Sequence, residues 1–234
     1  TEDGYLRRRP ALEFLFSVGS DPVQCLFCIE SRAFGASGTT FFEFFDDGVN
    51  PVTYTVRGTL TTTPDEYGIS MCSNGTTDGF ILITSGGTAD VYDCLLNTLT
   101  PVTDMDFPAN VSMCEFFAGY FFVLIRNTRA IQWSALEDPL SWDTFDVYER
   151  SWAGDWINFI KRSGTHIWVV GEQTSEVLYA TGGVEVFAPA QESLIEHGSC
   201  AHLAGQRVPD GIMCIDQDER GFGQVIVFSG LQPR

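Results

Sequence analysis

Five short apolar segments recur along this chain at a nearly constant interval, which limits the folds open to it. They begin at Arg32, Phe80, Tyr120, His166 and Gly211, and successive starts are 48, 40, 46 and 45 residues apart. After a polar turn, each is followed by a second segment of strand-like composition, at residues 40–45, 89–94, 130–134, 175–180 and 224–228. A period of about 40–50 residues with several short strands per repeat is typical of β-propeller blades. One four-stranded blade cannot bury both of its faces alone, so it needs a neighbour on each side.

The residues between these segments are those of tight turns. Four dipeptides that end in glycine can supply the positive φ of such turns, and they are Asp47-Gly48, Asn74-Gly75, Gly86-Gly87 and Gly182-Gly183. The near-continuous apolar runs 80–83 and 167–170 indicate strands that are covered on both faces. Residues 152–160 are expected to form at most a turn or two of helix. The sequence therefore predicts an all-β fold, a β-propeller-like array of short four-stranded blades with about 45 residues per repeat. A β-sandwich or barrel is the structural alternative.

No low-complexity linker divides the chain, so a second independent domain is not expected. Residues 1–20, which include Arg7-Arg-Arg9, are interpreted as an extended segment that leads into a β-propeller domain at residues 21–234. The missing initiating Met and the abrupt end at Gln232-Pro-Arg234 suggest part of a longer polypeptide, in which case this propeller is incomplete. No apolar run approaches 20 residues, so no membrane span is expected.

The chain carries a net charge of −18, spread evenly along its length. Residues 1–117 hold 16 acids and 5 bases, while residues 118–234 hold 15 and 8. Such a surface repels phosphates, so a DNA-wrapping role is not expected. One interpretation is a surface beside which DNA passes without sequence-specific binding. Solubility alone is the simpler explanation of the charge. Only Lys161 among the 13 bases is a lysine, and arginine suits fixed hydrogen-bonded contacts and protein interfaces.

The cysteines and histidines do not form a recognisable metal site. Seven cysteines lie scattered and mostly inside apolar strand patterns, which favours buried free thiols in a reducing compartment. Cys25-Leu-Phe-Cys28 has ligand-like spacing, but no second pair accompanies it, and a strand would point the two thiols to opposite faces. His166, His197 and His202 are interpreted as structural, although Glu196 lies beside one of them. No metal or cofactor is expected.

No catalytic set emerges from the sequence either. Carboxylate pairs such as Glu172 with Glu176, and Asp216 with Asp218, are expected among 31 acids and are interpreted as solvated loop residues. The segment 216–221 is interpreted as a hairpin tip rather than a calcium loop. Motifs for a nucleophilic serine or for phosphate binding are absent. The chain is therefore not expected to be an enzyme.

Two alternatives remain open beside a structural role. Trp133 and Trp168 lie inside expected strands and are assigned to the core. Trp152 and Trp156 lie in an irregular stretch and, with nearby Asp155, are candidates for a sugar-binding platform. A propeller glycoside hydrolase would instead require two acids that converge near the central axis.

Between residues 106 and 234, several short motifs follow one another in a fixed order. They are Asp106-Phe-Pro108, Gly119-Tyr-Phe-Phe-Val123, Gln132-Trp-Ser134, Asp138-Pro-Leu-Ser-Trp142, Val170-Gly-Glu-Gln-Thr-Ser-Glu-Val177, Ile195-Glu-His-Gly198 and Gly230-Leu-Gln-Pro-Arg234. This order resembles the packaged-DNA stabilisation proteins of short-tailed, P22-like phages, also called tail accessory or tail hub proteins. Residues 9–105 resemble that family more loosely. The segment after His197 and the strand expected at residues 211–215 depart from its pattern.

The resemblance implies a structural virion protein of the phage neck or tail hub. Similar proteins form a ring, hexameric by analogy, below the portal and adaptor proteins, where it closes the channel and seats a tail needle, spike or fibre. The resemblance also implies assembly in the host cytoplasm and no catalytic residues. The motif residues would mainly fix hairpin and blade geometry, and they are Trp133, Asp138, Pro139, Trp142, Gly171, Glu172, Glu176, Tyr179, Glu196, His197, Gly198, Pro233 and Arg234. We further expect Glu172 and Glu176 to pair with backbone amides or arginine side chains at a turn.

Overall fold

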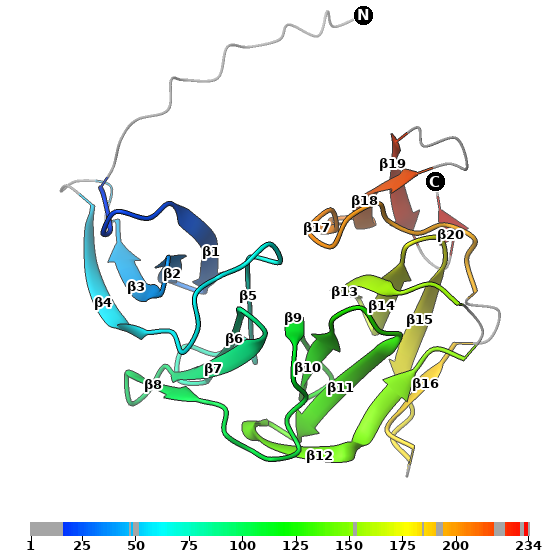
Figure 1. Ribbon diagram of the computed structural model, residues 1–234, viewed down its shortest axis with the longest axis horizontal. Helices are drawn as coiled ribbons and strands as arrows, with labels where there is room; N and C mark the ends of the chain where they lie inside the picture. Colours follow the sequence, from blue (N-terminus) through cyan, green and yellow to red (C-terminus); the bar gives the residue numbers. More distant parts are fainter. Residues whose placement is uncertain are drawn as a thin grey trace, which may run out of the picture.

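The described part of the chain folds into five four-stranded antiparallel sheets that follow one another in sequence, which we call blades 1 to 5 (Figure 1). A computed structural model describes residues 16–46, 48, 52–151, 154–183, 185–190, 194–217, 223–229 and 232–233. In every blade the four strands pair in the order in which they occur along the chain. Within these described residues there is no helix that could cross a membrane. The predicted all-β propeller architecture is confirmed.

Each blade is built from a continuous stretch of chain. Blade 1 contains β1 (Val23–Ile29), β2 (Arg32–Ser37), β3 (Thr40–Phe45) and β4 (Thr53–Thr59). Blade 2 contains β5 (Ile69–Ser73), β6 (Phe80–Ser85), β7 (Thr88–Asp93) and β8 (Thr98–Pro101). Blade 3 contains β9 (Val111–Phe117), β10 (Tyr120–Ile125), β11 (Ala130–Ala135) and β12 (Asp138–Glu149). Blade 4 contains β13 (Ile157–Ser163), β14 (His166–Gly171), β15 (Ser175–Ala180) and β16 (Phe187–Pro189). Blade 5 contains β17 (Gln206–Val208), β18 (Gly211–Gln217), β19 (Gly223–Ser229) and β20 (Gln232–Pro233).

The five segments that set the repeat in the sequence are the second strands of the five blades. Strands β2, β6, β10, β14 and β18 begin at the predicted residues, and the predicted following segments match β3, β7, β11, β15 and β19 to within one residue at each end. The expectation of a helical turn over 152–160 was wrong where the structure describes it. Ile157 and Phe159 instead pair with Gly171 and Val170 of the neighbouring strand, because β13 is the inner strand of blade 4.

Neighbouring blades bury their faces against each other. On β6, Ile81 and Ile83 belong to the apolar cluster between blades 1 and 2, whereas Leu82 belongs to the cluster between blades 2 and 3. On β10, Val123 belongs to the cluster between blades 2 and 3, whereas Leu124 belongs to the cluster on the other face of blade 3. These alternating directions explain why the sequence of such strands is apolar at every position. Each fully buried side chain of this kind contributes about 1.5–3 kcal/mol to folding.

The outer faces of blades 1 and 5 lack such a neighbour in the described structure, and Figure 1 shows these blades at the two ends of an open arc. Leu26 on blade 1 is 63% exposed, and Val225 on blade 5 is 67% exposed. Before blade 1, the Phe16 ring stacks on that of Tyr54, and Val18 is buried. Residues 1–15 of the predicted leading segment lie outside the described residues.

Glycines with positive φ lie at the expected turns. Gly75 has a φ of 84°, and Gly86 and Gly87 have φ values of 52° and 88°. Gly48 and Gly182 are also in the left-handed region, whereas Asp47 lies outside the described residues. Side chains other than Gly rarely adopt this backbone conformation, so these residues fix the hairpin geometry.

Candidate functional site

The motif Asp138-Pro-Leu-Ser-Trp142 forms the start of β12 in blade 3. The Asp138 carboxylate accepts a hydrogen bond from the backbone N–H of Leu140, at 3.0 Å. The indole N–H of Trp142 donates to the Pro139 carbonyl at 2.8 Å, and both residues are buried. The Trp142 backbone N–H donates to Asp104, whose pKa is lowered by the backbone N–H groups of Asp106 and Trp142. The motif therefore folds back on itself and anchors the outer strand.

A buried arginine joins blades 3 and 4. The side chain of Arg150 is fully buried, and its Nε lies 3.3 Å from Oε1 of Glu176 and its Nη1 3.7 Å from Oδ2 of Asp155. The opposite charges attract at these distances, but Nε and Nη1 of Arg150 and Oε1 of Glu176 form no hydrogen bond within the described structure. The guanidinium also donates to the Thr174 hydroxyl, and Tyr148 donates to the second Glu176 oxygen at 2.7 Å. Burial and then the Glu176 carboxylate raise the pKa of Tyr148, so its phenol stays protonated.

Asp155 is held by the turn between β14 and β15. Its Oδ2 accepts the backbone N–H groups of Gln173 and Thr174, at 2.9 and 3.1 Å, and its Oδ1 accepts the Thr174 hydroxyl at 2.8 Å. Burial opposes ionisation of Asp155, but these hydrogen bonds and the Arg150 charge outweigh burial and lower its pKa. This carboxylate is therefore committed to the turn and not available to a sugar.

Two motif glycines allow close backbone approach at this turn. A Cβ atom at Gly171 would lie 2.2 Å from the Asp155 carboxylate and 2.3 Å from the Arg150 guanidinium. A Cβ atom at Gly198 would lie 2.5 Å from backbone atoms of Glu172 and Gln173. Neither position has room for a side chain, so a glycine is required at both.

The Ile195-Glu-His-Gly198 segment connects blade 4 to blade 5. Ser175 donates to the His197 carbonyl at 2.6 Å, and the backbones of Ser175 and Ile195 exchange two hydrogen bonds. The Nδ1 of His197 lies 2.7 Å from Oδ2 of the buried Asp216, while Glu196 is exposed. The interpretation of Asp216 as a solvated residue was therefore wrong. Its carboxylate is buried and pairs with a histidine of the preceding linker. Asp218 lies outside the described residues.

The remaining motif residues lie apart from one another. Trp133 is in the core between blades 3 and 4, and its indole nitrogen has no hydrogen-bond partner within the described structure. Tyr179 is exposed on β15, Pro233 pairs with Phe228 across β19 and β20, and Arg234 lies outside the described residues. Glu176 is paired with an arginine, whereas Glu172 is exposed and makes no side-chain hydrogen bond or ion pair within the described chain.

The structure describes most of the residues considered for metal binding or for a sugar platform. In the part of the chain that the structure describes, no three His, Cys, Asp or Glu side chains could hold a metal ion together. Cys72, Cys94, Cys114 and Cys214 are buried free thiols, and Cys25 and Cys28 lie on opposite faces of β1. Trp168 is buried as expected, Trp156 is 50% exposed, and Trp152 lies outside the described residues.

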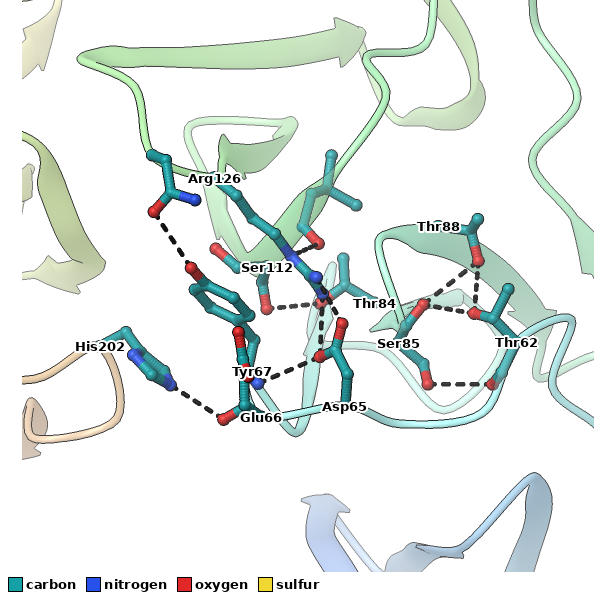
Figure 2. Close-up of polar contacts among 12 residues, drawn as sticks. Thr62, Asp65, Glu66, Tyr67, Thr84, Ser85, Thr88, Ser112, Arg126 and His202 are labelled. Atoms are coloured by element: carbon teal, nitrogen blue, oxygen red, sulfur yellow. Dashed lines mark hydrogen bonds and ion pairs between the residues drawn. The ribbon is translucent and has the colours of Figure 1, made fainter.

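The linker between blades 1 and 2 makes a set of contacts that sequence patterns did not indicate (Figure 2). Arg126, in the β10–β11 turn, binds both oxygens of Asp65 at 2.5 and 3.2 Å and lies 4.2 Å from the centre of the Tyr67 ring. Burial opposes ionisation of Asp65, but the Arg126 hydrogen bond outweighs it and lowers the Asp65 pKa. His202, in the linker to blade 5, lies 3.1 Å from the Glu66 carbonyl, and its ring contacts that of Tyr67. The linker therefore ties together blades 2, 3 and 5, as Figure 2 shows.

A second contact that the sequence did not reveal joins blades 1 and 2. Arg32 donates to both oxygens of Glu43, at 2.8 and 3.0 Å, and to the Cys94 carbonyl at 2.8 Å. Arg57 donates to Glu43 at 2.8 Å. Burial opposes ionisation of Glu43, but hydrogen bonds from the two arginines outweigh it and lower the pKa. One feature of the sequence could have indicated this contact, the single acid Glu43 inside the aromatic run 41–45. A carboxylate buried in such a run requires a cationic partner.

The inner strands of all five blades surround a central cavity of about 490 Å³. Residues of β1, β5, β9, β13 and β17 line it. This arrangement of four-stranded sheets around a common centre defines a β-propeller protein.

The particular family follows from comparison with known proteins. A family model described as "Bacteriophage P22 Gp10, beta-propeller", of the phage stabilisation type, matches residues 2–233. The chain belongs to this family, so it is a P22 Gp10-like phage stabilisation protein. None of the curated proteins matches the chain significantly.

Solved structures support the fold alone. PorZ, an essential bacterial surface component of the type-IX secretion system of Porphyromonas gingivalis, is 11% identical with a TM-score of 0.57, over 95% of this chain and 28% of PorZ. A functionally unknown protein from Desulfotomaculum acetoxidans is 12% identical with a TM-score of 0.54, over 89% of this chain and 70% of that one. Kluyveromyces lactis Hsv2 is 13% identical with a TM-score of 0.52, over 90% of this chain and 60% of Hsv2. The chain thus spans less than a third of PorZ, and such low identities carry no function.

Proposed function

We propose that this protein is a ring-forming subunit of the phage neck and tail hub, placed below the portal and adaptor proteins. In this role it closes the channel through which DNA was packaged and provides a seat for the tail needle, spike or fibres. The copies assemble as a hexamer in the host cytoplasm and are retained in the virion. The observation that carries the proposal is the family match over residues 2–233.

The charge of the chain supports a role beside DNA rather than on it. With a net charge of −18, the protein repels the phosphate backbone at ranges up to about a Debye length. A component that closes a DNA channel benefits from this repulsion, because DNA has to leave during infection without being held by the protein.

The exposed apolar side chains on the end blades support an assembly role. Val56 on blade 1 and Ile215 and Val225 on blade 5 are exposed on the sheet faces that no other blade covers in the described structure. Apolar side chains grouped on one sheet face are typical of protein–protein interfaces. Ion pairs such as that between Arg150 and Glu176 connect neighbouring blades.

The test is to locate the protein in virions and to remove it. Imaging of purified virions should show it as a ring on the portal axis, and particles assembled without it should fill with DNA and then lose it. DNA retention is measured as nuclease-resistant DNA per capsid. Absence of the protein from virions, or full retention of DNA without it, would contradict the proposal.

A matched pair of variants tests the apolar face. Val225→Asp should reduce incorporation into virions, because it places a charge on the uncovered face of blade 5. Met105→Asp is the control, since Met105 is exposed in the β8–β9 linker and away from that face. Equal incorporation of the two variants, with both folded, would remove the face from the assembly argument.

A further inference from the structure

The basic side chains of the described chain divide into two groups. Five arginines form ion pairs with carboxylates, and they are Arg32, Arg57, Arg126, Arg129 and Arg150. Among the described residues, the other three basic side chains are Lys161, Arg162 and Arg207, and none of them has a carboxylate partner within ion-pair distance. All three line the central cavity. Within the described residues, the cations without a carboxylate partner are thus gathered in one place.

The position of these cations is set by the inner strands. Lys161 and Arg162 lie next to each other near the end of β13 in blade 4, and Arg207 is the middle residue of β17 in blade 5. The Lys161 charge is felt across the cavity at Cys25 of blade 1, where burial and the Cys114 thiol raise the thiol pKa to about 11 and Lys161 opposes that rise. Lys161 is one of the residues that line the cavity.

The one acid that lines the cavity does not neutralise them. Glu115 on β9 accepts backbone N–H groups, from Phe116 at 3.1 Å and from Arg162 at 3.2 Å. With three cations and one anion, the cavity wall carries a net positive charge inside a chain of net charge −18. Apolar residues form part of the remaining wall, and they are Leu26, Phe27, Met71, Met113, Phe116 and Leu203.

We propose that the central cavity binds a small organic anion, a compound with one phosphate or carboxylate group attached to an apolar body. The volume of about 490 Å³ lies within the range of small-molecule sites, roughly 300–1,000 Å³. Lys161 and Arg207 bind the anionic group from two adjacent blades, and the Met and Phe side chains contact the apolar body. A nucleic acid strand is excluded, because the acidic exterior repels a polyanion and only a compact ligand fits.

Calorimetric titration of the purified protein tests the proposal. The probes are phenyl phosphate, phenylacetate, inorganic phosphate and neutral benzyl alcohol. We expect phenyl phosphate or phenylacetate to bind, and whichever binds more tightly identifies the anionic group. Affinity should fall as salt is raised, since the interaction is between charges. Benzyl alcohol should bind at least tenfold more weakly than the better anion. If inorganic phosphate binds as tightly as phenyl phosphate, the site is for an adventitious ion only and the proposal fails.

Variants assign the binding to the cavity. Lys161→Met and Arg207→Gln should each weaken binding about tenfold or more, because a hydrogen bond to a charged group contributes at least that factor. Arg129→Gln is the control, since Arg129 lies in the β10–β11 turn and does not line the cavity. Lys161→Arg keeps the charge and should retain binding, which separates lost charge from misfolding. Unchanged affinity in both Lys161→Met and Arg207→Gln, or no binding of either aromatic anion to the wild type, would overturn the proposal.

Discussion

Replacing Glu43 by glutamine should destabilise the protein through the junction of blades 1 and 2. The carboxylate is 2% exposed and accepts three charge-assisted hydrogen bonds, two from Arg32 and one from Arg57. Hydrogen bonds to charged groups contribute about 1.5–3 kcal/mol each, and breaking a fully buried ion pair costs about 3–5 kcal/mol. Glutamine keeps the volume and one acceptor oxygen, and both arginines reach some solvent. We therefore expect a loss of about 3 kcal/mol in the free energy of unfolding.

Thermal and denaturant unfolding at pH 7 measure this loss. For a chain of this size, about 3 kcal/mol corresponds to a fall of roughly 6–12 °C in Tm. The matched control is Glu149→Gln, which removes an ion pair to Arg129 in which the two side chains are 62% and 38% exposed. Exposed pairs contribute about 0–1 kcal/mol, so the control should shift Tm by at most a few degrees. Equal shifts for the two variants would refute the argument that burial makes the Glu43 pair strong.

The same pair predicts a dependence on pH. The folded state lowers the pKa of Glu43, so its contribution is complete above the pKa of the unfolded chain and is lost as pH falls through the lower, folded pKa. The stability difference between wild type and Glu43→Gln should therefore be largest near neutral pH and should shrink in acid. Denaturant unfolding of both proteins between neutral pH and about pH 3 measures it. A difference that stays constant into acid would contradict the assignment.

Three further substitutions test individual contacts. Gly171→Ala should lower Tm by several degrees, because its Cβ would collide with the buried Arg150 guanidinium, and thermal unfolding beside a Gly154→Ala variant, whose Cβ would meet no atom within 4 Å, would show it. Trp142→Phe keeps most of the buried area but loses the hydrogen bond to the Pro139 carbonyl, so denaturant unfolding should show a loss of about 1 kcal/mol. Arg126→Met should leave the blades folded but increase hydrogen exchange at residues 65–68, and unchanged exchange there would count against the linker contacts.

The sequence was sufficient to find the strands that are buried on both faces. The second and third strands of blades 2, 3 and 4 lie between neighbouring blades, so runs such as 80–83 are apolar at every position and stand out against the turns. The outer strands gave a weaker signal. On β4 and β8 most side chains are exposed, and their Thr-rich sequences resemble loops, so their bounds were not predicted.

The polar contacts could not be predicted because they join residues that are distant in sequence. Arg126 and Asp65 are 61 residues apart, and His202 and Glu66 are 136 apart. Their meeting depends on how the blades are placed around the centre, which no local pattern encodes. The motif glycines were found through resemblance, but the reason for Gly171, the close approach of Asp155, is visible only in three dimensions.

The pairing of strands in chain order has a consequence for how the protein forms. Each sheet can close its own hairpins as soon as its stretch of about 45 residues has left the ribosome, since no strand has to wait for a partner from a distant part of the chain. Blade-on-blade packing can then spread from one nucleus to the next, as in other repeat arrays. Such a nascent chain gains structure progressively during synthesis, and its contact order stays low for an all-β protein.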